Sequence, residues 1–338
     1  MTTLQRALFY LLLLAGGLLS ALTWTSLINN SSLWFLQVLN FPRLAMLLAL
    51  MSCLLLFLLL PHGWTRATWL FLASLLLSIG IQAYILFPYS SLAPTVVETV
   101  SKAAVSQQAT FSILVANVWI DNRHAQELLS IIATKQPTFV LTMEVNQWWV
   151  HQLDGLGKEY PYCIKYPTRN AYGMALYAKL PLDKPTIRFL HHRQVPSFTT
   201  TITLPNKRQF QLWTLHPVAP FPSQYPTNIG GKEVALLRAG RLIAQQAQPT
   251  VVAGDFNDVG WSPNTTQFAA ISGLRDVRRG RGMYSTFDAR SLLLRWPLDY
   301  VFVSSQFKVL AVERLAAFGS DHFPYYVALA YQPGLVRH

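Results

Sequence analysis

The sequence predicts an α+β sandwich, in which two sheets lie face to face with helices outside them, preceded by three membrane-spanning helices. Residues 1–88 contain three long apolar stretches and no Asp or Glu. Beyond residue 110, short apolar runs typical of buried strands outnumber the segments with helical apolar spacing. The chain therefore divides into an apolar helical part and a β-rich domain.

Charge differs between the two parts. Residues 1–88 carry only Arg6, Arg43 and Arg66, a net charge of +3. The 15 acidic residues and the other 24 Lys and Arg (27 − 3) lie beyond, so the rest of the chain carries about +9 (24 − 15). A basic domain attracts polyanions or anionic lipid headgroups, although solubility explains scattered charge equally well. The two cysteines lie in different parts, so no disulfide is predicted.

Residues 1–88 are interpreted as a membrane anchor with three helices at about residues 7–27, 44–60 and 67–87. Each stretch is uncharged and close to the ~20 residues that cross a ~30 Å hydrocarbon core. The first stretch also fits a signal peptide, since Arg6 precedes it. Two further apolar stretches follow it at once, so a retained anchor is the simpler interpretation.

Arginines flanking the apolar stretches predict the orientation of the anchor. Arg6 and Arg66 would lie on one side of the bilayer and Arg43 on the other, so the positive-inside rule favours a cytoplasmic N-terminus. Three crossings then place residues 89–338 outside the cytoplasm. We expect a multi-pass protein of the inner (cell) membrane with a periplasmic or extracytoplasmic domain. The predicted spans contain no Asp, Glu or Lys that would indicate a transport path.

Residues 89–109, rich in Ser, Ala and Gln, are predicted to be a linker, and residues 110–338 a folded domain. Helical apolar spacing predicts helices at 124–134 and 232–246. Short apolar runs predict strands at 111–118, 138–143, 173–177, 199–204, 209–215, 250–253, 298–303 and 325–330.

Polar motifs follow or lie in several of these predicted strands. An isolated Asn or Asp at a strand end is usually a turn former, and an isolated His is usually a satisfied polar side chain. Six such positions, most of them beside an apolar run, instead predict a site at one edge of the sandwich. They are Asn117, Glu144, His216, the GDFN motif at 254–257, Asp299 and the GSDH motif at 319–322.

Three of these residues have the oxygen atoms that Mg²⁺ prefers as ligands. We predict that Asn117, Glu144 and Asp321 bind Mg²⁺, with Mn²⁺ as an alternative. A phosphoester carries negative charge that repels a nucleophile, and a divalent cation would neutralise it. The motifs therefore point to metal-dependent hydrolysis of a phosphoester.

The remaining polar residues fit the proton transfers of such a reaction. Asp255 with Asn257 would orient and deprotonate the attacking water. His322 would stabilise the transition state, with Asp299 holding its tautomer. His216 would donate to a phosphate oxygen.

The order of these motifs resembles the endonuclease/exonuclease/phosphatase superfamily, whose fold is that of pancreatic deoxyribonuclease. The superfamily also includes abasic-site endonucleases, inositol polyphosphate phosphatases and neutral sphingomyelinases. The resemblance extends from Phe111 to Ala330 and implies a four-layer α/β/β/α sandwich with its site at one edge. It also implies, motif by motif, the same roles for the eight residues named above.

Two features depart from the family pattern. Met143 precedes Glu144, where the family usually has Gln. Trp119, two residues after Asn117, makes a DNA-repair function less fitting. With three N-terminal spans, the extension at 214–220 most resembles a bacterial membrane-anchored branch of the superfamily.

The sequence leaves three functions open. The favoured one is hydrolysis of a membrane lipid phosphoester, with the bilayer and the phosphoester as partners. Residues 218–231, rich in Pro and aromatic side chains, would then be a lid or a membrane-touching loop, although an ordinary long loop fits equally well. The second is a nuclease acting on DNA or RNA, which the basic charge favours. The third is a non-catalytic, membrane-tethered binding module. No protein partner is predicted.

Overall fold

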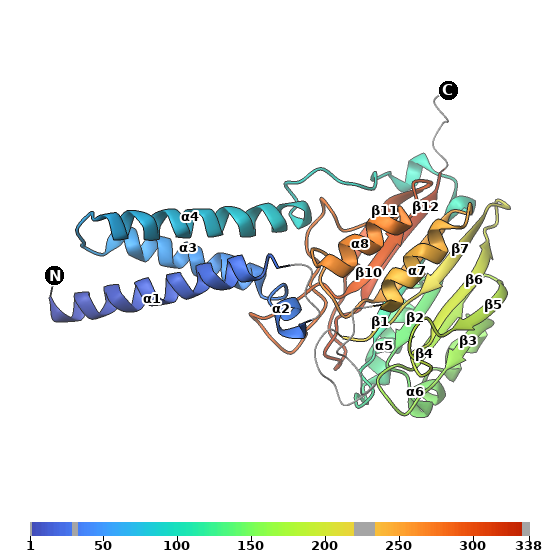
Figure 1. The fold of residues 1–338 in the computed structure, drawn as a ribbon. Coiled ribbons are helices and arrows are strands. Elements are labelled where there is room, and N and C mark those ends of the chain that lie inside the picture. The colour runs from blue at the N-terminus through green and yellow to red at the C-terminus, as the bar shows by residue number, and fades with distance from the viewer. Residues whose placement is uncertain (1, 29–32, 220–233, 333–338) are drawn as a thin grey trace, which may run out of the picture.

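A computed structural model describes residues 2–28, 33–219 and 234–332. Three apolar helices form an elongated bundle on one side of a β-rich domain (Figure 1). They are α1 (Thr3–Thr25), α3 (Arg43–Leu59) and α4 (Arg66–Leu86), and a short helix α2 (Trp34–Val38) lies at the domain end of the bundle. Leu50, Phe57 and Leu75 form the buried centre of the bundle.

Two of the three expected spans are long and apolar enough to cross a membrane, namely Thr3–Thr25 and Arg66–Tyr89. The middle helix, Arg43–Leu59, is apolar but has 17 residues, about 26 Å at 1.5 Å per residue. Arg43 is the first residue of this helix. It is buried and donates to the Ser26 carbonyl, Asn40 and Gln82. Its guanidinium therefore joins α1, the α2–α3 turn and α4.

The domain consists of two six-stranded sheets, which confirms the predicted two-sheet architecture. The first sheet has the strand order β11-β12-β1-β2-β4-β3 and the second β5-β6-β7-β8-β10-β9. The strands are β1 (Thr110–Asn117), β2 (Phe139–Met143), β3 (Tyr162–Tyr166), β4 (Met174–Ala178), β5 (Leu182–Arg188), β6 (Ser197–Thr203), β7 (Gln209–Thr214), β8 (Thr250–Asp255), β9 (Arg275–Asp276), β10 (Asp299–Val303), β11 (Phe307–Arg314) and β12 (Tyr325–Tyr331).

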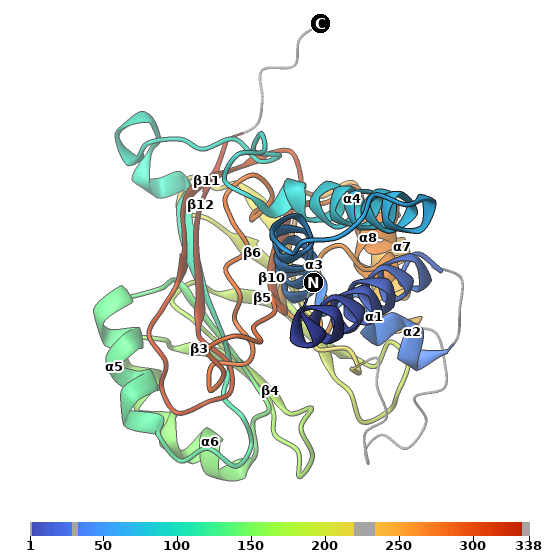
Figure 2. The same ribbon diagram turned by 90° about the vertical axis from the view of Figure 1, so that its left-hand side faces the viewer.

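Helices cover the outer face of each sheet, so the layers follow the order α/β/β/α (Figure 2). The helices are α5 (Ala125–Lys135), α6 (Gln147–Gln152), α7 (Val234–Ala244) and α8 (Pro263–Ser272). One apolar core fills the space between the sheets, where Phe111 stacks on Phe210 at 4.7 Å. A second core joins α5 and α6 to the first sheet, and a third joins α7 and α8 to the second.

Strand direction brings the polar motifs to one edge. β1 runs parallel to β2 in one sheet, and β7 runs parallel to β8 in the other. The carboxyl ends of these four strands carry Asn117, Glu144, His216 and Asp255. β10 is antiparallel to β8, and its first residue, Asp299, pairs with Asp255. Strand ends that lie far apart in sequence therefore meet at one place.

The strands that the sequence did not predict include β3, β5, β9 and β11, each at the edge of a sheet. Edge strands carry polar residues on exposed positions, as β5 does, and so lack a continuous apolar run. Residues 89–109, expected to be a linker, lie against the domain. Val97 is buried in the core between the sheets, and Val100 N–H donates to the Val309 carbonyl. The segment 218–231 lies almost entirely outside the described residues.

The anchor contacts the domain through a small aromatic cluster. Phe41, in the turn between α2 and α3, packs with Val259 and Leu298, and its ring lies 5.8 Å from that of Trp296. The Trp261 indole N–H donates to the Asn40 carbonyl at 2.7 Å. Because Val259 and Leu298 follow β8 and precede β10, the anchor touches the same edge of the sandwich as the polar motifs.

Candidate active site

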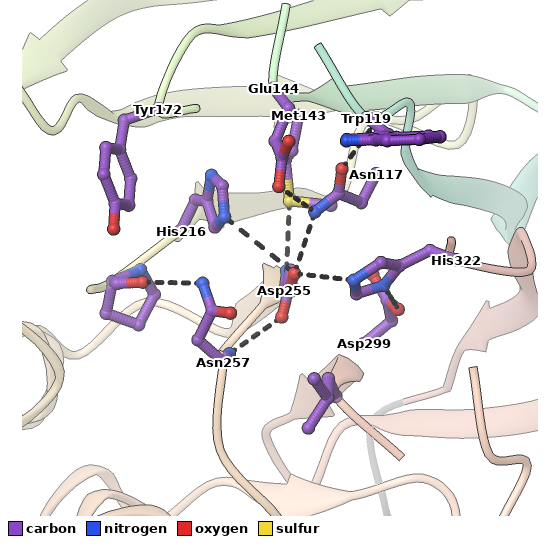
Figure 3. Close-up of polar contacts among 12 residues, drawn as sticks. Asn117, Trp119, Met143, Glu144, Tyr172, His216, Asp255, Asn257, Asp299 and His322 are labelled. Atoms are coloured by element: carbon purple, nitrogen blue, oxygen red, sulfur yellow. Dashed lines mark hydrogen bonds and ion pairs between the residues drawn. The ribbon is translucent and has the colours of Figure 1, made fainter. Parts of the chain in front are cut away.

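Asp255 lies at the centre of the polar cluster (Figure 3). Its Oδ2 accepts from Asn117 Nδ2 at 3.0 Å and lies 3.5 Å from His322 Nε2 and 3.9 Å from His216 Nε2. Its Oδ1 accepts from the Asn257 backbone N–H at 2.8 Å. Asp255 is fully buried, and burial raises the pKa of its carboxyl group, an effect that the positive charge of His322 partly offsets. This carboxylate is therefore a strong candidate for a base.

His322 forms a buried pair with Asp299. Its Nδ1 lies 2.8 Å from Asp299 Oδ2, which leaves Nε2 directed at Asp255. Burial alone lowers the pKa of His322, but the carboxylates of Asp299 and Asp255 outweigh burial and raise it well above the usual value. The imidazole is therefore cationic at neutral pH and can stabilise negative charge on a substrate.

Asn117 holds two carboxylates in place. Its amide nitrogen donates to Glu144 Oε1 and Asp255 Oδ2, both at 3.0 Å. Its amide oxygen accepts from the Trp119 backbone N–H at 3.0 Å. The amide thus directs nitrogen, not oxygen, at the site, which is the geometry of a positioning residue. The predicted role of Asn117 as a direct metal ligand stays a prediction.

Glu144 and Asp321 supply carboxylates at the more accessible side of the cluster. The carboxyl group of Glu144 also accepts from the Ile120 backbone N–H. Burial raises the pKa of Glu144, and the negative charge of Asp321 raises it further. The hydrogen bond from Asn117 lowers it, but burial has the larger effect. Asp321 Oδ2 lies 3.9 Å from Arg290 Nη2. This contact is long because Arg290 forms its close ion pair, at 2.7 Å, with Asp288. Two carboxylates that repel each other in this way fit a divalent cation.

A second group could also hold a metal ion. Asp255, Asp299 and His322 each place one ligand atom within 4.8 Å of the others. However, His322 Nδ1 already forms a hydrogen bond with Asp299 Oδ2, so only Nε2 could bind a metal, and the raised pKa of His322 keeps a proton on that atom. We therefore assign this group to proton transfer and charge stabilisation.

His216 is buried, and its environment keeps it neutral. Burial, and after it the positive charge of His322, lowers the pKa of His216 to about 3. The ring of Tyr172 lies 5.2 Å from it, and its Nδ1 has no hydrogen-bond partner in the described part of the chain. Beside it, Asn257 Nδ2 donates to the Pro217 carbonyl. A neutral His216 can donate a hydrogen bond to a phosphate oxygen but cannot supply charge.

Strained backbone marks the site. Trp119, Glu144 and Asn257 adopt positive φ angles of 54°, 61° and 52°, a region that few residues other than glycine occupy. Gly254 has a φ of 145°, and a Cβ there would lie 1.9 Å from the Leu215 carbonyl oxygen. Only glycine lets the end of β8 approach the end of β7 this closely, and the approach brings Asp255 beside His216.

The structure brings seven of the eight predicted residues into one hydrogen-bonded or ion-paired cluster, with Asp321 beside it.

Several supporting residues were not predicted from the sequence. The Ser320 hydroxyl donates to the Asn117 carbonyl and accepts from the His322 backbone N–H. The Asp255 backbone N–H lies 3.0 Å from Met143 Sδ, where the family usually has Gln. Thr286 Oγ1 accepts from the Asp299 backbone N–H, and no local signal in the sequence indicates this role.

Similarity to known proteins agrees with this geometry. The model of the endonuclease/exonuclease/phosphatase family matches residues 114–322, more than half of the chain. Members of this family are generally hydrolases that act on phosphoesters, and they are typically dependent on divalent metals. None of the curated proteins matches the chain by sequence.

Solved structures share the fold at low identity. The human nocturnin catalytic domain with bound sulfate has a TM-score of 0.54 and 18% identity, covering 68% of this chain and 97% of that one. A Bacteroides vulgatus endonuclease/exonuclease/phosphatase gives 0.53 and 17%, covering 66% and 99%. D. rerio TDP2 complexed with single strand DNA product gives 0.52 and 16%, covering 65% and 99%. The chain belongs to the endonuclease/exonuclease/phosphatase family.

Proposed function

We propose that this protein is a membrane-anchored, Mg²⁺-dependent phosphoesterase that hydrolyses a phosphate mono- or diester by attack of water. The observation that carries the proposal is the buried cluster in which Asp255 faces the His322–Asp299 pair. A buried base beside a cationic imidazole suits a reaction in which water loses a proton and a phosphoryl group gains negative charge.

Glu144 and Asp321 would hold the metal ion, with Asn117 orienting Glu144. Their donor set consists of hard carboxylate oxygens, and their mutual repulsion would be relieved by a divalent cation. When bound, Mg²⁺ supplies neutralising charge to the phosphate oxygens. Mn²⁺ accepts the same oxygen ligands and would substitute for it.

The chain's own residues then have separate tasks. Asp255 accepts a proton from water, while the Asn257 backbone N–H fixes the carboxylate through its other oxygen. Asp299 keeps His322 protonated, so that Nε2–H, beside Asp255, would donate to the reacting phosphate oxygens. His216 stays neutral and donates a hydrogen bond.

A membrane lipid phosphoester is the favoured substrate. We propose that α1, α3 and α4 together span the bilayer, with the middle helix packed against both of its longer neighbours and its exposed leucines facing lipid. The anchor contacts Val259 and Trp296, so the substrate edge would lie close to the bilayer rather than far from it. We also propose a multi-pass protein of the inner membrane with the site outside the cytoplasm, as in a bacterial membrane-anchored branch of the family.

Two other functions remain candidates. A nuclease is favoured by the positive charge of the domain and by the similarity to TDP2, which was solved with a single strand DNA product. A non-catalytic binding module would keep the fold without turnover.

The test is release of phosphate or headgroup by the purified full-length protein with Mg²⁺, run in parallel on a phospholipid panel and on DNA. Asp255→Ala is the control, because it removes the base while leaving a small side chain in the buried position. Lipid turnover that is lost in the variant supports the proposal. DNA cleavage alone would replace it with a nuclease. No turnover of either substrate, with metal still bound, would favour the binding module.

A further inference from the structure

Three consecutive leucines form the most exposed large apolar surface of the domain. Leu292, Leu293 and Leu294 are 87%, 89% and 49% exposed. Elsewhere among the described residues from 110 onward, the large apolar side chains classed as exposed are Tyr162 and Phe189, at 40% and 41%. Exposed leucines of this kind generally mark a binding surface.

The leucines lie in a loop, Asp288–Trp296, which we call the leucine loop. The Leu294 backbone N–H donates to Ser291 Oγ at 2.9 Å, and Arg295 Nε donates to the Ser291 carbonyl at 2.6 Å. Backbone hydrogen bonds between Phe287 and Trp296 close its base. These bonds within the loop hold the leucines at its tip.

The loop lies beside the domain end of the anchor. Its last residue, Trp296, packs edge-on against Phe41 in the α2–α3 turn at 5.8 Å. The same end of the bundle exposes further apolar side chains, Trp24, Phe35, Tyr84 and Phe87, as helices do where they leave a bilayer.

We propose that the leucine loop inserts Leu292, Leu293 and Leu294 into the bilayer interface next to the anchor, with Arg290 and Arg295 at the level of the lipid phosphates. The inference rests on the proposed membrane anchoring. A lipid surface fits better than a protein partner, because the tip continues an anchor surface that is itself apolar. The arginines flanking the leucines also match anionic headgroups.

Insertion would fix the active-site edge against the membrane. Phe287, at the base of the loop, lies 4.9 Å from the His322 ring. Arg290 lies over the Trp119 ring at 5.2 Å and 3.9 Å from Asp321. The loop thus joins the bilayer surface directly to residues on both sides of the site.

The experiment places an environment-sensitive fluorophore on Leu293→Cys in the full-length protein, with Cys53→Ala and Cys163→Ser removing the other thiols. The protein is reconstituted into vesicles of zwitterionic and anionic phospholipid, with and without spin-labelled lipid as quencher. Leu77→Cys, exposed in the middle of α4, reports the anchor. Ser305→Cys, exposed after the opposite end of β10, reports water.

We expect a blue shift and quenching by shallow spin labels at position 293, quenching by deep labels at 77, and neither at 305. Adding Leu292→Ser and Leu294→Ser should reduce the quenching at 293. A probe at 293 that behaves like the one at 305, while 77 is quenched, overturns the loop insertion and leaves the anchor standing. A blue shift at 293 without lipid quenching indicates a protein contact and also overturns it. An unquenched probe at 77 refutes anchor and loop together.

Discussion

At the scale of single residues, the site depends on the electrostatic interactions among Asp255, Asp299 and His322, all of them buried. Asp299 and Asp255 both raise the pKa of His322, and His322 in turn limits the rise at Asp255. The arrangement keeps a carboxylate base and an imidazolium side by side in a place where either charge alone would be costly. The protonation states of His322 and Asp255 therefore depend on each other, and that of His322 depends on Asp299 as well.

Asp299→Asn should lower kcat by about 10²- to 10⁴-fold and move the alkaline limb of the pH–rate profile to lower pH. The Asp299 carboxylate raises the pKa of His322, so its removal lets the imidazolium lose its proton earlier as pH rises. The profile of kcat/KM against pH checks this. Asp183→Asn, on exposed strand β5, is the control and should change neither quantity. An unshifted limb would show that His322 is not held cationic by Asp299.

Glu144→Gln should raise the Mg²⁺ concentration needed for half-maximal activity by about 10-fold or more, since one charged ligand becomes neutral. The Asn117–Glu144 contact can persist because an amide oxygen also accepts a hydrogen bond. Metal titration of activity, with direct calorimetric binding beside it, measures the effect. Unchanged titration curves would place the metal elsewhere.

At the scale of elements, the two parallel strand pairs and one glycine build the site. The end of β8 reaches the end of β7 only because residue 254 has no side chain. The Leu215 backbone N–H donates to the Ala253 carbonyl just before this contact. The position of Asp255 relative to His216 is thus determined by backbone packing between two strands.

Gly254→Ala should lower the free energy of unfolding by about 3 kcal/mol or more, because the added Cβ would overlap the Leu215 carbonyl and the φ of 145° is unfavourable for alanine. Gly273→Ala is the matched control. Gly273 also has a positive φ, of 68°, but open space around it, so about 1 kcal/mol is expected. Thermal unfolding followed by circular dichroism compares the two. Equal losses would mean that the close strand contact is not decisive.

At the scale of the whole molecule, the anchor and the domain meet beside the site. Trp261 bonds to the Asn40 carbonyl, and its ring lies 5.4 Å from that of Tyr89, just after α4. The α2–α3 turn and the residue that follows α4 therefore both hold the loop that follows Asn257. Movement of the anchor relative to the domain would be transmitted to this loop first.

Trp261→Ala should increase amide hydrogen exchange at Val259–Ser262 and lower stability by about 2–3 kcal/mol, through loss of a half-buried ring and one hydrogen bond. Trp148→Ala on α6, another half-buried tryptophan, should leave exchange at these residues unchanged. Hydrogen exchange measured by mass spectrometry on the reconstituted protein compares the Trp261→Ala and Trp148→Ala variants. Unaltered exchange in Trp261→Ala would indicate that the anchor does not support the loop.

The sequence by itself determined which strands are buried and which polar residues end them, because burial of a central strand requires a continuous apolar run and a site requires polar groups beside it. Asn117, Glu144 and Asp255 could be found in this way. Tertiary structure decided what local pattern does not contain: the edge strands β5 and β11, the amide orientation of Asn117 and the neutral state of His216. It also decided the contact between the anchor and the site edge. Those features depend on contacts between residues far apart in the chain, whose desolvation and charge no short stretch of sequence specifies.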